Sequence, residues 1–171
     1  RASYYAVYNV KGVETHNLAQ RGGIVHNNMP ICYIPHTTFI STADDEMVIA
    51  LESHQAERGI YHAAKDGGTL VYYNTVWQPL SVRLNQAAEV TPGQIKRACD
   101  ARHINLFEVI DAVLPDSRMQ NIAVLAVVNA RHLIPDVAEY HYCSAMTDLM
   151  AGELLETNLH LFYRISSQCL Q

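Results

Sequence analysis

Two places in the sequence carry side chains that could act on a substrate. Ser41 and Thr42 end a strand-like run and come just before a short acidic stretch, and Glu108 lies in a second apolar run ahead of Pro115. A hydroxyl at a strand end can orient a catalytic carboxylate or line a nucleotide pocket. A carboxylate can stabilise positive charge that develops on a reacting carbon. The alternatives are a hydroxyl N-cap for the following helix and an outward-facing acid on a half-buried strand.

Histidine and cysteine are the residues that most often bind metals, and the chain has nine His and four Cys. The cysteines, Cys32, Cys99, Cys143 and Cys169, form no C-x-x-C pair, so we expect no metal site. If His141 and Cys143 lie on a strand, their side chains face the same way. A surface histidine near a core cysteine is the favoured interpretation there. Two disulfides and four buried thiols are equally compatible with the cysteine count.

Several classes of function are disfavoured by what the sequence lacks. It has no G-x-S-x-G, Walker, G-x-G-x-x-G or H-E-x-x-H motif. With 12 basic and 17 acidic residues, and no basic run longer than Lys96–Arg97, we expect no nucleic-acid partner. The longest apolar run, Ile122–Val128, is too short to span a membrane. Because the chain opens at Arg1, we expect a mature or trimmed fragment.

Local patterns in the first part of the chain predict mostly strands and loops. Tyr4–Val10 is rich in aromatic and β-branched residues and predicts a strand. Glu14–Gln20 predicts one or two helical turns ended by a Gly pair. Ile24–Pro35, with two Pro and two Asn, predicts a loop, and Thr37–Ser41 predicts a short strand.

The middle of the chain shows clearer helix and strand signals. Acidic residues from Asp44 and apolar residues at helical spacing predict a helix that runs to Gly59. After a turn at Asp66–Gly68, Thr69–Trp77 is the most strand-like segment of the first half. Thr91–Pro92 predicts the start of a helix that runs to about His103.

The last part predicts a strand at Leu106–Val113, a buried strand at Ile122–Val128 and a helix at Ser144–Leu161. These signals are mixed without regular βαβ alternation. They therefore favour an α+β fold, and we expect one domain over residues 1–171.

The order of these segments resembles the catalytic chain of bacterial ADP-ribosylating toxins of the cholera and pertussis type. The resemblance covers roughly residues 4 to 128. It is carried by segments in family order: Val7–Lys11, Leu18–Gly23, Phe39–Thr42 followed by the helix predicted from Asp44, Gly68–Trp77, a helix leading into Leu106–Glu108, then Leu114–Pro115 and Ile122–Leu125.

The resemblance implies an ADP-ribosyltransferase-like single domain with small central mixed sheets and flanking helices. Its implied activity is NAD-dependent mono-ADP-ribosylation of a host protein acceptor, with NAD as substrate. Glu108 and Ser41 would be catalytic, and Asn9, Lys11, Ser41 and Thr42 would contact NAD. The implied protein is a secreted toxin or virulence effector, with a toxin-type hetero-oligomer as a further expectation.

The chain departs from the toxin pattern at two positions. Asn9 stands where the family has a phosphate-binding Arg, and Leu106 stands two residues before Glu108, where the family has Glu or Gln. Lys11 could replace the Arg only as a point charge, without its fork. The alternatives are a transferase with a relocated phosphate clamp and a catalytically inactive pseudoenzyme that serves as a secreted binding module. A structural assembly protein without a small-molecule site is a third hypothesis.

Overall fold

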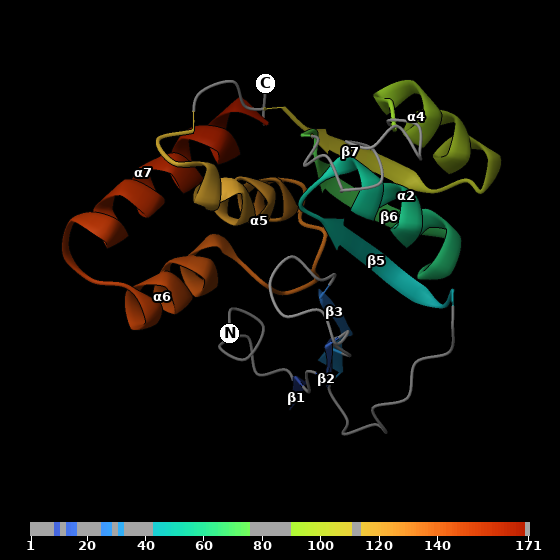
Figure 1. Ribbon diagram of the computed structural model, residues 1–171. Coiled ribbons are helices and arrows are strands. Elements are labelled where there is room, and N and C mark those ends of the chain that lie inside the picture. The colour runs from blue at the N-terminus through green and yellow to red at the C-terminus, as the bar shows by residue number, and fades with distance from the viewer. Residues whose placement is uncertain are drawn as a thin grey trace.

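The computed structural model describes the side chains of residues 43–75, 90–110 and 114–169, Ser117 apart, and only the backbone of four short strands before them. These strands are β1 (Asn9–Val10), β2 (Val13–His16), β3 (Val25–Asn28) and β4 (Ile31–Cys32). β1 pairs with β4 and β2 pairs with β3, both antiparallel. Figure 1 labels β1, β2 and β3.

Two predictions for this part are therefore wrong. Glu14 to His16 form a strand rather than a helical turn, and the expected loop at 24–35 contains β3 and β4. Cross-strand pairing overrides the weak local preferences of Asn and Glu. Asn9–Val10 agrees with the predicted first strand, and Thr37–Ser41 lies outside the described residues.

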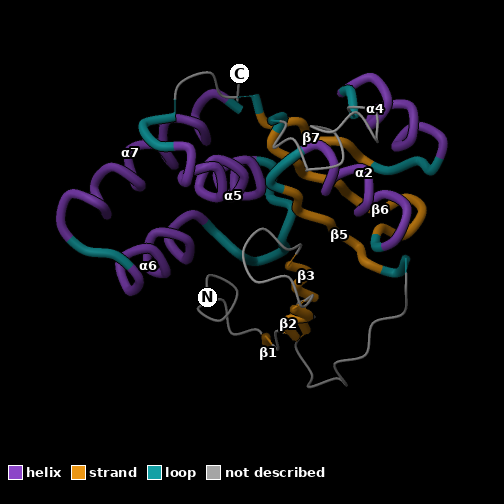
Figure 2. The backbone as a smooth tube through the Cα atoms, in the orientation of Figure 1, coloured by secondary structure: helices purple, strands orange, loops and turns teal. Residues whose placement is uncertain are grey.

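The centre of the described part is a parallel sheet in the order β5–β6–β7. Its strands are β5 (Asp45–Ala50), β6 (Ala64–Tyr73) and β7 (Asn105–Val109). Helix α2 (Ser53–His62) connects β5 to β6, and α4 (Pro92–Ala101) precedes β7. Helices thus alternate with strands from 45 to 109, contrary to the expectation of no regular βαβ alternation. Helices cover both faces of the sheet (Figure 2).

The predicted helix from Asp44 to Gly59 is correct only from Ser53 onward. Residues 45–50 form β5, in which Val48 and Ala50 pack against the α2 side of the sheet. Alternation of side chains across a strand, together with pairing to β6, prevails over the acidic residues that suggested a helix start. Glu52 is the actual N-cap of α2.

The α2/α4 core fills the space between the sheet and these two helices. Its fully buried side chains include Ile60, Leu70, Tyr72, Ile95 and Cys99. The predicted start of α4 is confirmed, because Thr91 caps the helix and shares a capping box with Gln94.

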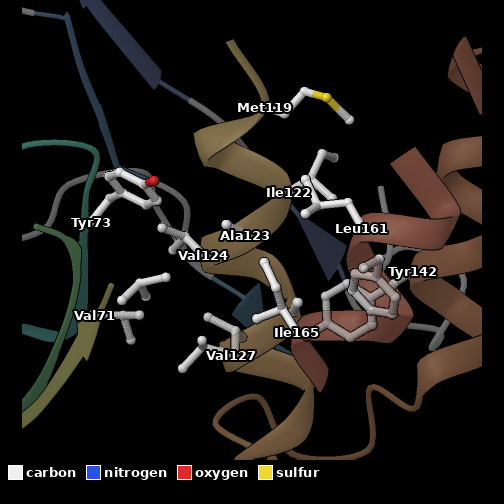
Figure 3. Packing of buried hydrophobic residues seen from close by; sticks show 14 of the residues in the cluster. Val71, Tyr73, Met119, Ile122, Ala123, Val124, Val127, Tyr142, Leu161 and Ile165 are labelled. Atoms are coloured by element: carbon white, nitrogen blue, oxygen red, sulfur yellow. The ribbon is translucent and has the colours of Figure 1, made fainter. Parts of the chain in front are cut away.

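The α5 core lies on the other face and is built around α5 (Gln120–Ala130), which follows a 3-10 turn at Ser117–Met119. Figure 3 shows α5 between Val71 and Tyr73 of the sheet and Leu161 and Ile165 of α7. The prediction of a strand at Ile122–Val128 is wrong. A short apolar run without polar interruptions has no period that separates a buried strand from a buried helix.

The C-terminal helix predicted at Ser144–Leu161 is two helices, α6 (Glu139–Leu149) and α7 (Gly152–Gln168). The chain becomes extended at Met150 and Ala151, and Gly152 has a φ of 58° that favours glycine. This break lets α7 pack on α5, whereas a continuous helix would run past it.

The prediction of a mixed α/β domain is confirmed, but an ADP-ribosyltransferase architecture is not shown. Two elements of the proposed toxin order have the opposite structure: 45–50 is a strand and 122–128 is helical. Among the described residues, no helix is long and apolar enough to cross a membrane. The described thiols Cys99, Cys143 and Cys169 are free, so two intrachain disulfides do not form.

Candidate functional site at the carboxyl edge of the sheet

In open α/β sheets, ligands bind outside the carboxyl ends of the strands. In this chain that edge carries Glu52 and Ser53 after β5, Asn74 and Thr75 after β6, and Glu108 near the end of β7. The register aligns Ala50, Tyr72 and Glu108 across the three strands. These polar side chains therefore lie at one edge.

Buried Ser53 ties the start of α2 to the end of β6. Its backbone N–H and its hydroxyl both donate to the carbonyl oxygen of Thr75, at 2.9 Å and 3.1 Å. This double contact fixes the distance between two strand ends, so the edge is a preorganised surface.

The amide groups that open α2 are occupied by the protein's own carboxylate. Glu52 accepts hydrogen bonds from the backbone N–H of Gln55 at 2.6 Å and of His54 at 3.1 Å. At α4, the Thr91 hydroxyl accepts from the Gln94 N–H at 3.3 Å, and the Gln94 side chain accepts from the Thr91 N–H at 2.8 Å. Neither helix start therefore offers the free amides that bind phosphates in many α/β proteins.

Glu108 is exposed and is held by one neighbour on the edge. Its carboxylate accepts a hydrogen bond of 2.6 Å from the side-chain amide of Asn74. Tyr72, its register partner, is fully buried, and its hydroxyl finds no hydrogen-bond partner in the described part of the chain. Burial, and then the negative charge of Glu108, raise the pKa of the Tyr72 hydroxyl.

The structure places the residues predicted from the sequence unevenly. Glu108 lies on a strand, as predicted, and is exposed near the carboxyl end of β7. Ser41, Thr42 and Lys11 lie outside the described residues, and Asn9 is described only as backbone of β1. The described residues therefore do not test whether Asn9, Ser41 and Glu108 meet at one site, as their roles in the toxin resemblance would require.

Sequence reasoning missed Asn74 and Glu52. Asn74 lies inside the predicted strand Thr69–Trp77, but β6 ends at Tyr73, so Asn74 directly follows the strand and lies at its carboxyl edge. Glu52 falls in the interior of the helix predicted from Asp44 to Gly59, because that prediction begins the helix too early. A correct boundary between β5 and α2 reveals both its capping role and its place at the edge.

His141 and Cys143 lie on helix α6, not on a strand, and their environments differ from the expectation. His141 is buried, and its Nδ1 accepts a hydrogen bond from the N–H of Ala138 at 2.9 Å. Cys143 is half-buried, with Sγ 3.1 Å from the Tyr163 hydroxyl, and this contact raises the pKa of Tyr163 to about 12. The described residues contain no group of three or more His, Cys, Asp or Glu that could hold a metal.

The sheet separates the cysteines. Cys99 is buried in the α2/α4 core, whereas Cys143 and Cys169 pack against the α5 core on the opposite face. Burial, then the charge of Asp100, raises the pKa of Cys99 to about 11. Cys99 is thus a packed thiol rather than a ligand.

Comparison with known families gives one match. The family model described as pyruvate ferredoxin/flavodoxin oxidoreductase matches residues 1–166. No curated protein matches the chain.

This match overturns the resemblance to ADP-ribosylating toxins. The toxin assignment, the NAD-dependent transferase activity, the inactive-transferase alternative and the expected role as a toxin or virulence effector are wrong. The resemblance depended on a few short segments and on an element order that the structure contradicts at 45–50 and 122–128.

NAD as a substrate is wrong for the same reason. At the described edge, its diphosphate would meet the carboxylate of Glu52 instead of free helix amides. The expectations of secretion and of a host protein acceptor rested on the toxin resemblance, and the described residues do not test secretion. Because a single family model spans residues 1–166, the chain belongs to the pyruvate ferredoxin/flavodoxin oxidoreductase family.

Proposed function

We propose that this chain is a module of an oxidoreductase that oxidises pyruvate and passes the electrons to ferredoxin or flavodoxin. The family match over residues 1–166 carries this proposal. In the proposal, the chain supplies a rigid α/β platform, and another part of the enzyme holds the redox cofactors.

Enzymes of this family use thiamine pyrophosphate and iron–sulfur clusters. A cluster of the common type needs four cysteine thiolates around one centre. The chain has four cysteines in all, and the sheet stands between Cys99 and the pair Cys143 and Cys169. The cysteines of this chain therefore do not fit a four-cysteine cluster.

Thiamine pyrophosphate needs a site for its diphosphate, usually helix amides or a divalent cation held by carboxylates. Both helix starts at the carboxyl edge are capped from within the chain, at α2 by Glu52 and at α4 by Thr91 with Gln94. The described residues also contain no group of three or more His, Cys, Asp or Glu that could hold a cation, so they do not fit this group either. Both mismatches support a cofactor-bearing partner.

The test compares the chain alone with the chain recovered from its native cells. A tagged full-length chain is purified without oxygen from both sources, and iron, thiamine and pyruvate-dependent reduction of methyl viologen are measured. We expect the isolated chain to be colourless and inactive, and the native preparation to contain iron and to reduce the viologen. A native preparation without pyruvate-dependent reduction contradicts the proposal, as does a cluster reconstituted on the isolated chain.

A further inference from the structure

We propose that the carboxyl edge of the sheet docks the cofactor-bearing partner, and that Glu108 receives an arginine or lysine side chain of that partner. This inference rests on the proposed function, since it presupposes that the redox cofactors lie outside this chain. It adds the surface of this chain that meets them.

Large apolar side chains flank Glu108 on the same edge. Leu51, just after β5, is 44% exposed, and Ile110, just after β7, is 73% exposed. With neighbouring strands about 5 Å apart, the ends of β5 and β7 are separated by ~10 Å. A footprint of ~800 Å² on one partner easily includes both. Apolar side chains next to a few fixed polar groups are typical of protein interfaces.

The charge at this edge selects a cationic partner group. The Asn74 amide donates to one oxygen of Glu108, and no ion pair with Glu108 occurs among the described residues. Asn74 is rigidly placed, because β6 and β7 pair through its backbone N–H and the carbonyl of Val109 at 2.9 Å. A guanidinium or ammonium group of the partner would pair with the Glu108 carboxylate through a charge-assisted hydrogen bond.

Two competing readings of the surface are weaker. A phosphate ligand is disfavoured, because the Glu52 carboxylate fills the α2 start and Glu108 adds a second negative charge at the edge. The exposed apolar residues on the C-terminal helices do not form a continuous stripe along either helix. On each helix they are nine residues apart, about two and a half turns, and so face opposite ways: Tyr140 and Leu149 on α6, Leu154 and Tyr163 on α7.

The experiment changes the edge and compares it with a matched surface elsewhere. The tagged full-length chain carrying Glu108→Lys or Ile110→Asp is purified from native cells beside Glu156→Lys and Leu154→Asp, which change exposed residues of α7. Iron per chain and pyruvate-dependent viologen reduction are the readouts, and thermal unfolding checks that each variant folds. We expect at least a tenfold loss of both readouts for the edge pair and wild-type values for the α7 pair.

Two further measurements cover variants that fail to fold. Glu108→Gln keeps the shape of the side chain and removes its charge, so we expect its iron retention to be weaker than wild type and less sensitive to salt. A photo-crosslinking residue at position 110 should capture an iron–sulfur protein, and the same residue at position 154 should not.

The proposed docking surface is wrong if folded edge variants keep the wild-type amount of iron per chain. It is also wrong if the α7 control variants lose as much iron as the edge variants. A crosslink at 154 but not at 110 has the same consequence. Failure of the proposed function is recognised separately, because the wild-type preparation itself then lacks iron and pyruvate-dependent reduction.

Discussion

The two edges of the parallel sheet differ in how far their charged side chains are paired within the chain. At the amino edge, the Arg102 guanidinium donates to the backbone carbonyls of Ile60 and Ala64 and to the carboxylate of Asp66, the last two at 2.8 Å and 2.7 Å. At the carboxyl edge, Glu108 has Asn74 as its one hydrogen-bonded neighbour among the described residues. One edge is closed by internal partners, and the other leaves a carboxylate exposed for an external one.

Glycines at the amino edge strengthen this contrast. The register between β5 and β6 shifts there, and Gly67 adopts a φ of 74° while its N–H donates to the Arg102 carbonyl at 3.0 Å. The predicted turn at Asp66–Gly68 is thus an irregularity inside β6. The irregular backbone and the Arg102 contacts together hold the amino edge. Mutations there should therefore lower the free energy of unfolding, whereas mutations at the carboxyl edge should weaken binding of the partner.

The largest effect on stability is expected from Arg102→Met. This change leaves two partly buried carbonyls without their donor, which costs about 2–4 kcal/mol of unfolding free energy. Urea unfolding followed by circular dichroism measures it. Arg97→Met, at an exposed position of α4, is the control and should change stability by less than about 0.5 kcal/mol. If the two variants lose the same unfolding free energy, the Arg102 contacts do not stabilise the amino edge.

A smaller loss is expected from Gly68→Ala. An added Cβ would lie 2.9 Å from the carbonyl oxygen of Lys65 and 3.1 Å from that of Glu46, and these backbone atoms move little. We expect a loss of about 1–3 kcal/mol. Gly93→Ala, whose Cβ meets only the flexible tip of Arg97 at 3.8 Å, should be neutral or slightly stabilising. If Gly68→Ala leaves the unfolding free energy unchanged, the backbone at the amino edge accommodates the added Cβ.

At the carboxyl edge, Glu52→Ala should cost about 1 kcal/mol, because two amides of α2 lose their cap. The variant should also gain an anion response: sodium sulfate should raise its melting temperature more than that of the wild type. Glu57→Ala, in the middle of the same helix, should show neither change. Identical sulfate responses of Glu52→Ala and the wild type argue against a site closed by its own carboxylate.

The smallest effect concerns the buried thiol of Cys99 in the α2/α4 core. The pKa of Cys99 is raised from 9.0 to about 11, so above pH 9 the unfolded chain releases this proton before the folded one. This contribution to stability is complete below pH 9 and is lost as the pH rises toward 11. In denaturant titrations, the unfolding free energy of Cys99→Ala should therefore fall less between pH 9 and pH 11 than that of the wild type.

Thiol labelling checks the same placement. In the native protein, half-buried Cys143 and Cys169 should react before fully buried Cys99, which should react only with unfolding. Rapid native labelling of Cys99 would contradict its place in the α2/α4 core.

The parts of the fold that could be predicted are those with a local physical signal. Thr91 followed by Pro92 marks a helix start, because the cap and the fixed proline φ act within a few residues. The β-rich run from Thr69 and the exposed acid at Glu108 are also correct. Predictions failed where partners distant in sequence decide, as at Asp45–Ala50, whose strand depends on pairing with β6.

The sequence by itself determined a mixed domain with an apolar core, one well-capped helix and an acidic residue on a strand. Tertiary structure decided that Ile122–Val128 is helical, because only packing between the sheet and α7 gives a helix apolar surroundings on every side. It also decided that Asn74 meets Glu108 while Glu52 caps α2 at the same edge. Strand order and register bring these residues together, and neither is encoded in any short stretch of the chain.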